Sequence, residues 1–322
     1  MQRRTILAAA AGTVVLGATS RAGAQTAITK IIVAVPPGGG MDATARLAAE
    51  NVREALGTVI VENKPGAALR LALQYVKDAP PDGLTLLYTS ISAFTVYPHV
   101  YKRLGYNAET DLVPVAPTVD YDFALGVPGS SPVSTLAQYI AAVKKDPATM
   151  GTYAVPGAGS SVHFAGAAFG AAAALEMKYV PYKGSAPAMQ DLIGGHVPAC
   201  VNVLGEFLPY RASGKVKVLA TTGARRSALA PDVPTFAELG YPSLVLGEQF
   251  GLFAPARTPA DTVAKINRAV TAAMQKPEVQ RRLAEMGYAS AALSPAAFAD
   301  KLRQDRAIWG TLVKATGFTL DE

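Results

Sequence analysis

A buried strand and a glycine-rich turn are predicted by the segment Ile31-Ile32-Val33-Ala34-Val35-Pro36-Pro37-Gly38-Gly39-Gly40-Met41-Asp42. Its apolar, mostly β-branched start is typical of a strand that is covered on both faces, as in a parallel sheet. Asp42 stands where the N-cap of a helix is expected, and apolar residues then recur every three or four positions until Gly57. We therefore expect a strand, a turn and an amphipathic helix.

The same order of strand, turn and helix recurs along the chain. Further strands are expected over residues 58–62, 84–88, 123–127, 151–155, 177–181, 197–204, 216–221 and 250–253. Helical patterns cover residues 67–79, 135–145, 162–174, 187–193, 259–274, 277–286 and 295–315. Strands that alternate with helices indicate an α/β protein built on parallel sheets.

Two crossings divide this series into two domains. The extended stretch at 123–127 runs into Pro128-Gly129-Ser130-Ser131-Pro132, after which a second alternating series begins, and residues 250–253 form the return crossing. We expect one domain from residues 25–126 plus 247–322 and another from residues 127–246. Open α/β sheets bind ligands at the carboxyl ends of their strands, so a ligand is expected in the cleft between the domains.

Composition excludes several classes of protein. Half of the 322 residues are hydrophobic and 17% are charged, which is typical of a globular protein. The single cysteine, Cys200, cannot form an intramolecular disulfide, and the three histidines show no metal-binding spacing. We therefore expect no metal and no cofactor.

Residues 1–24 are interpreted as an export signal. Arg3 and Arg4 precede an apolar stretch over residues 6–18, and Ala22-Gly23-Ala24 forms a small-x-small cleavage site. The apolar stretch is too short to span a bilayer core of about 30 Å. Export to the periplasm with cleavage after Ala24 is expected, by either the general secretory or the twin-arginine route.

The mature chain has little net charge. Without the leader, the chain has 27 basic and 24 acidic residues, so the net charge falls from +6 to +3. No cluster of Lys and Arg is present to follow a phosphate backbone, and nucleic-acid binding is not expected.

Two glycine-rich turns are candidate anion sites. Backbone N–H groups of Gly38-Gly39-Gly40 can approach a ligand without a Cβ in the way, at the positive end of the following helix. The turn Pro156-Gly157-Ala158-Gly159-Ser160-Ser161 repeats this arrangement in the second domain and adds two hydroxyls. Either turn can also be explained as a tight connection between a strand and a helix.

A serine hydrolase is the enzymatic alternative at the second turn. Ser160 or Ser161 would be the nucleophile and His163 the base, but the G-x-S-x-G motif is absent. Hydroxyls and amides dominate the strand ends, which suits holding a polar ligand better than breaking a bond. We therefore predict no enzyme and no catalytic residues.

The expected ligand-binding residues all follow predicted strands. They are Gly38, Gly39, Gly40, Met41, Asp42, Ser90, Ser92, Ala158, Gly159, Ser160, Ser161, His163, Tyr182, Lys183, Gly184 and Ser185.

Seven motifs, in the same order along the chain, resemble those of the substrate-binding receptors of tripartite tricarboxylate transporters, the Bug family. They are Val35-Pro36-Pro37-Gly38-Gly39-Gly40-Met41-Asp42-Ala43-Thr44-Ala45-Arg46, Val61-Glu62-Asn63-Lys64-Pro65-Gly66-Ala67, Pro81-Asp82-Gly83-Leu84-Thr85-Leu86-Leu87, Gly157-Ala158-Gly159-Ser160-Ser161-Val162-His163, Val180-Pro181-Tyr182-Lys183-Gly184-Ser185-Ala186-Pro187-Ala188, Pro231-Asp232-Val233-Pro234-Thr235 and Gly251-Leu252-Phe253-Ala254-Pro255. The resemblance covers nearly the whole mature chain.

The resemblance implies a monomeric periplasmic binding protein of type II architecture, with two α/β domains and a central cleft. Such receptors close over a small carboxylate and deliver it to a membrane permease of the tripartite type. The family holds the carboxylate through backbone amides and waters at positions 38–42 and 158–161, with Ser90 and positions 182–185 as the wall. Presentation of the closed form to a sensor is the alternative role.

One motif departs from the family pattern. Where the family has Gly-Ala-Gly-Gly-x-x-Gly, this chain has Gly66-Ala67-Ala68-Leu69-Arg70-Leu71-Ala72. The loss of glycines narrows the backbone conformations open to this turn. Arg70 is a candidate specificity residue that could meet a second carboxylate of the ligand.

Overall fold

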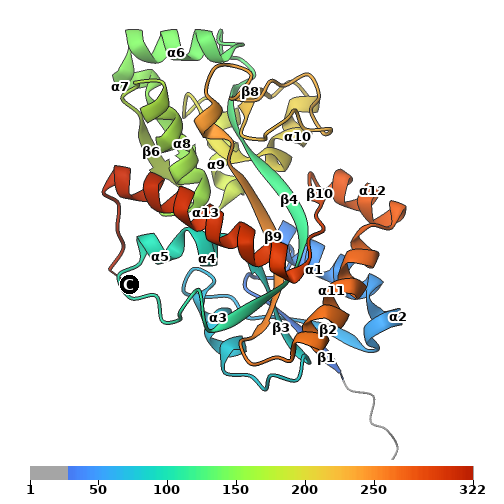
Figure 1. Cartoon of the computed structure of the whole chain (residues 1–322). Helices are drawn as coiled ribbons and strands as arrows, with labels where there is room; N and C mark the ends of the chain where they lie inside the picture. The colour runs from blue at the N-terminus through green and yellow to red at the C-terminus, as the bar shows by residue number, and fades with distance from the viewer. Residues whose placement is uncertain (1–27, 322) are drawn as a thin grey trace, which may run out of the picture.

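The computed structural model describes residues 28–321 (Figure 1). The predicted export signal, residues 1–24, lies outside this range. Within it, no helix is long and apolar enough to cross a membrane.

The first half of the sheet carries the amino-terminal strands. β1 (Thr29–Val33) pairs in parallel with β2 (Val59–Asn63) and β3 (Thr85–Ser90). β9 (Gly247–Pro255) lies antiparallel to β3 and to the first part of β4 (Leu112–Pro128), which gives the order β2-β1-β3-β9-β4. The short strand β10, Ala289–Ser290, also pairs with β4.

The second half of the sheet continues from the same strand. From Phe123 onward, β4 pairs antiparallel with β7 (Cys200–Val203) and β8 (Val216–Thr221). β5 (Thr152–Val155) then pairs in parallel with β7 and with β6 (Lys178–Pro181). The α/β fold class is confirmed, and the sheet is mixed because β4, β8, β9 and β10 pair antiparallel.

Helices cover both half-sheets (Figure 1). Those that follow first-half strands are α1 (Gly40–Asn51), α2 (Arg53–Leu56), α3 (Arg70–Lys77), α4 (Ser92–Thr95), α5 (Tyr97–Val100), α11 (Ala260–Met274), α12 (Pro277–Glu285) and α13 (Pro295–Thr316). Those of the second half are α6 (Leu136–Lys145), α7 (Pro147–Met150), α8 (Ser161–Ala172), α9 (Ser185–Ile193), α10 (Leu204–Ala212) and the 3-10 turn Pro242–Leu244. The long helix α13 runs across the middle of the molecule and contacts α4, α5 and α8.

The expected N-cap at Asp42 is wrong. The glycines allow α1 to start at Gly40 with Gly39 as its N-cap, so Asp42 lies inside the first turn. Its carboxylate reaches back and accepts a hydrogen bond from the N–H of Gly38 at 3.0 Å. The acid thus still satisfies a backbone donor at the helix start, from a position within the helix.

The turn before α3 adopts an unusual backbone conformation. Ala67, Ala68 and Leu69 have φ values of 46°, 49° and 75°, in the left-handed region that disfavours residues with a Cβ. This segment is where the chain lacks the glycines of the family motif. Three consecutive residues therefore hold a conformation that glycine would adopt without strain.

Ala68→Gly should relieve part of this strain. We expect the free energy of unfolding to rise by about 0.5–1 kcal/mol, since the left-handed penalty exceeds the added entropy of the unfolded glycine. Urea denaturation measures the change. Ala307→Gly, on the exposed side of α13, is the control and should lower stability by about 1 kcal/mol. A loss of stability in Ala68→Gly would contradict the strain assignment.

Candidate functional site

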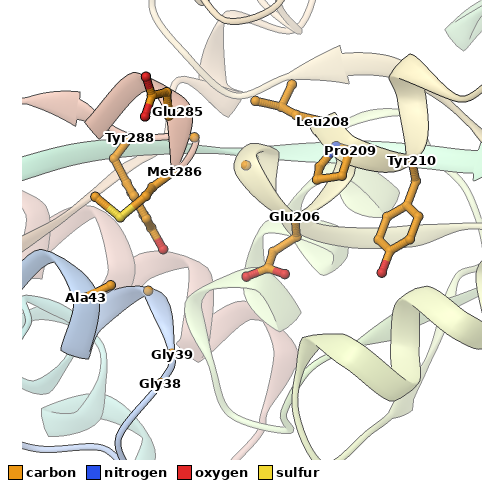
Figure 2. A pocket seen from close by; sticks show the side chains of 13 residues that line it. Gly38, Gly39, Ala43, Glu206, Leu208, Pro209, Tyr210, Glu285, Met286 and Tyr288 are labelled. Carbon is orange, nitrogen blue, oxygen red and sulfur yellow. The ribbon is translucent and has the colours of Figure 1, made fainter. Parts of the chain in front are cut away.

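A cavity of about 590 Å³ opens between the two half-sheets (Figure 2). Its walls are the turn that leads into α1, helix α10 of the second half, and the segment from the end of α12 to β10. The lining residues are Gly38, Gly39, Gly40, Ala43, Gly205, Glu206, Leu208, Pro209, Tyr210, Glu285, Met286, Gly287 and Tyr288. This volume is in the range of small-molecule sites.

The first glycine turn presents backbone donors to this cavity. Among the described residues, the N–H groups of Gly39 and Gly40 have no hydrogen-bond acceptor. A Cβ at Gly39 would meet nothing within 4 Å, so the chain here borders open space. The amino end of α1 adds its partial positive charge behind these groups. The turn can therefore accept a carboxylate.

A polar network holds the turn in place. The Asp42 carboxylate accepts hydrogen bonds from the Arg46 guanidinium at 2.9 and 3.0 Å and from the Asn63 amide at 2.8 Å. Asn63 also donates to the carbonyl of Val35 at 3.0 Å. Burial opposes charge on Asp42, but these hydrogen bonds and that from Gly38 lower its pKa below the ordinary value. Asp42 is therefore ionised and serves as an anchor for the turn.

The opposite wall carries an unpaired acid. Figure 2 shows the Glu206 side chain extending from α10 into the cavity, on the side that faces the turn of Gly38 and Gly39. Within residues 28–321, its carboxylate has no hydrogen-bond or ion-pair partner, and burial raises its pKa. Tyr288 lies close to the start of α1, because a Cβ at Gly40 would overlap its hydroxyl.

The second glycine turn is occupied by contacts within the protein. The Ser160 hydroxyl donates to the carbonyl of Gly157 at 2.6 Å, and the N–H of Gly159 donates to Nδ1 of His163 at 3.2 Å. Gly159 has a φ of 74°, and a Cβ there would press on Phe318 at 3.1 Å. Ala158 is exposed, and none of these residues lines the cavity.

His163 lies in a cluster of aromatic rings. Its ring centroid is 3.9 Å from that of Tyr179 and 5.0 Å from that of Phe318. Burial lowers its pKa to about 4, so the ring is neutral and accepts the Gly159 hydrogen bond. No hydrogen bond found in the described structure joins His163 to Ser160 or Ser161. The arrangement of a nucleophilic serine and its base is therefore not formed.

A buried glutamate joins two of the predicted hydroxyls. Glu248 of β9 is 1% exposed and accepts hydrogen bonds from Ser90 at 2.6 Å and from Ser161 at 2.7 Å. Tyr121 donates to the same carboxylate at 3.1 Å, and Ser92 lies 2.7 Å from Ser90. Ser90 belongs to the first half-sheet and Ser161 begins α8 of the second half, so this carboxylate bridges the halves.

The remaining candidates lie apart from the cavity. Tyr182 donates to Asp191 at 2.6 Å, Ser185 donates to Asn202 at 3.2 Å, and Lys183 is exposed. Met41 is buried in the core, and Gly184 is the N-cap of α9.

Arg70 contacts residues of the first half of the structure. Its guanidinium donates to the carbonyls of Ala67 at 2.8 Å and Arg103 at 3.1 Å, and lies 4.2 Å from the ring centroid of Tyr101. It is not among the residues that line the cavity.

Glu206 and Glu248 were not predicted from the sequence. Glu206 lies in α10, a helix that was not expected: residues 197–204 were expected to form one strand, and Pro209 lies inside the helix. Glu248 carried a visible signal, since this acid and Gln249 directly precede the apolar return crossing. No group of acids, histidines or cysteines in the described part of the chain is arranged to hold a metal.

Two half-sheets joined by shared strands, with a polar cavity between them, form the architecture of periplasmic solute-binding proteins. The model of the tripartite tricarboxylate transporter family receptor matches residues 44–318, and the chain belongs to this family. A UPF0065 protein of Bordetella bronchiseptica is similar, with 37% identity over 86% of this chain and 82% of the relative.

Solved structures of the same kind are similar over nearly their whole length. The periplasmic binding protein BugD has a TM-score of 0.77 at 32% identity, covering 91% of this chain and 98% of its own. Rpa4515 of R. palustris, solved with adipate, has a TM-score of 0.81 at 29% identity, with 90% and 97% covered. MatC of Rhodopseudomonas palustris, with bound malate, has a TM-score of 0.77 at 28% identity, with 89% and 99% covered.

The Glu248 bridge should make stability depend on pH. Burial raises the pKa of Glu248 from its ordinary 4.5 to about 7. The folded state thus favours the protonated carboxyl, and this stabilisation is complete below pH 4.5 and is lost as the pH rises through 7. Relative to Glu248→Gln, which stays neutral, the wild-type protein should lose about 3 kcal/mol of unfolding free energy between pH 4 and 8.

Urea denaturation of both proteins across this range tests the prediction. At each pH, the unfolding free energy of Glu248→Gln is subtracted from that of the wild type. The contributions of the other buried acids are the same in both proteins and cancel. If this difference in unfolding free energy did not vary with pH, the pKa of Glu248 would be the same in the folded and unfolded states, which would contradict the prediction.

Proposed function

We propose that this protein is a periplasmic receptor that captures a small organic carboxylate in the cavity between its two half-sheets. The observation that carries the proposal is the pair of backbone N–H groups, at Gly39 and Gly40, that border the cavity without an acceptor among the described residues. Each charge-assisted hydrogen bond to a carboxylate contributes about 1.5–3 kcal/mol. The adipate and malate in the related structures are carboxylates of the size that the proposal requires.

Capture would involve a hinge motion of two domains, residues 25–126 plus 247–322 and residues 127–246. β4 and β9 connect them, and the closing surfaces are the turn before α1 and helix α10. Closure would remove the carboxylate from water, which strengthens its hydrogen bonds. The hydrogen bonds from Ser90 and Ser161 to Glu248 join the two halves beside the connecting strand β9.

The captured acid would be delivered to a membrane permease of the tripartite tricarboxylate type. The mature receptor would act as a monomer in the periplasm, which the predicted export signal and the family support. Deletion of the gene should abolish uptake of the acid that binds the purified protein, and the wild-type gene should restore it. Unchanged uptake after deletion would instead favour presentation of the ligand to a sensor.

Gly39→Val tests the binding site. The added side chain would enter open space, so the fold should be retained, but it would cover the amides that bind the carboxylate. In a thermal-shift panel of small carboxylates, a wild-type ligand at a hundred times its Kd should stabilise by about 2.7 kcal/mol. Gly39→Val should lose this response and keep its ligand-free melting temperature.

Ala272→Val, on the exposed side of α11, is the control and should respond as the wild type does. Absence of any response from the wild-type protein would contradict the proposed function. A full response in Gly39→Val would show that the carboxylate binds elsewhere.

A further inference from the structure

We infer that the ligand of this receptor carries a cationic amino group in addition to its carboxylate, and that Glu206 binds this group. The inference rests on the proposed function, because it assigns the carboxylate to the turn of Gly39 and Gly40. The inference adds that Glu206, on the opposite wall of the same cavity, selects ligands with an ammonium group.

The charges that line the cavity are unequal. Two of the lining residues, Glu206 and Glu285, are acids, and none of the lining residues in the described chain is Lys or Arg. The partial positive charge of the cavity comes from backbone, at the amino ends of α1 and α10. A dicarboxylate would thus place its second negative charge against acids, with no side-chain cation to offset it.

Glu206 lacks the partners that the other buried acids of the cleft have. Glu248 receives hydrogen bonds from Ser90, Ser161 and Tyr121, and Asp42 receives them from Arg46 and Asn63. Glu206 receives none from the described residues, although its side chain is mostly withdrawn from solvent and extends into the cavity (Figure 2). A partly buried carboxylate without a side-chain counter-charge is unfavourable, and an ammonium group would supply that charge.

The two ends of such a ligand match the two walls. Its carboxylate would accept hydrogen bonds from the amides at the start of α1, and its ammonium would donate to Glu206 on α10. Because these walls belong to different half-sheets, a ligand that reaches both would favour the closed arrangement. A monocarboxylate without the amine would contact only the first wall.

Isothermal titration calorimetry with matched acids tests the inference. At each of several chain lengths, the probes are the α,ω-dicarboxylate, the unsubstituted monocarboxylate, the ω-amino acid and the α-amino acid. For the wild-type protein, the best amino acid should bind roughly ten- to hundredfold more tightly than the dicarboxylate and monocarboxylate of the same length. Glu206→Gln should lose this advantage and bind the monocarboxylate with unchanged or higher affinity.

Two further variants separate a specific role of Glu206 from general effects of charge or folding. Glu278→Gln removes an exposed acid of α12 outside the cavity and should keep the wild-type preference. Glu206→Lys should reverse the preference in favour of the dicarboxylate, a gain that a misfolded protein cannot show.

The inference and the proposed function fail in different ways. A wild-type protein that binds the dicarboxylate as tightly as the best amino acid would overturn the inference and leave the carboxylate receptor intact. Equal losses for the amino acid and the monocarboxylate in Glu206→Gln would also overturn it, because they would indicate a structural role. Binding of none of the probes would overturn both.

Discussion

The hydrogen-bond ladder along β4 sets the relative positions of both half-sheets. This strand of 17 residues pairs with β9 as far as Asp122 and with β7 and β8 from Phe123 onward, so it belongs to both halves. β9 runs antiparallel beside its first part and carries Glu248 into the junction. Because strands rather than flexible loops connect the halves, the proposed hinge motion would bend these strands at the junction. The turn before α1 and helix α10 are thereby held across one cavity.

The acids of the cleft have different environments and therefore different roles. Hydrogen bonds to Asp42 lower its pKa and keep it ionised, and its carboxylate fixes the turn before α1. Glu248 is enclosed by hydroxyls of both halves. Glu206 extends into the cavity without a partner among residues 28–321. Of these three acids, only Glu206 lines the cavity. In the proposed site, the backbone donors across from it would bind the carboxylate end of the ligand.

Much of the fold follows from local sequence. The strand over residues 216–221 has the predicted bounds, and the helix starting at Pro277 ends within one residue of its prediction. Periodicity and glycine or proline at the ends determine such elements. Prediction from local sequence failed at α10, because Pro209 lies within the helix and an apolar strand directly precedes it.

The candidate site was harder to predict because its contacts are between distant residues. The turn of Gly38 to Gly40, which the sequence predicts to bind the ligand, lines the cavity, and a run of glycines before a helix is a signal that the local sequence contains. Ser90 and Ser161 were expected to face a ligand, but a glutamate 158 and 87 positions away along the chain occupies their hydroxyls in the structure. No local pattern shows which residue fills the space beside a hydroxyl.

The most direct test of the account is nuclear magnetic resonance of the protein with isotope-labelled glycine, titrated with the acid that binds most tightly in calorimetry. The amide resonances of Gly39 and Gly40 should shift strongly and saturate at the calorimetric Kd, because their N–H groups acquire a charged acceptor. The Gly159 resonance should move little, since its N–H is already bonded to His163. Saturable shifts at Gly159 with none at Gly39 and Gly40 would contradict the account.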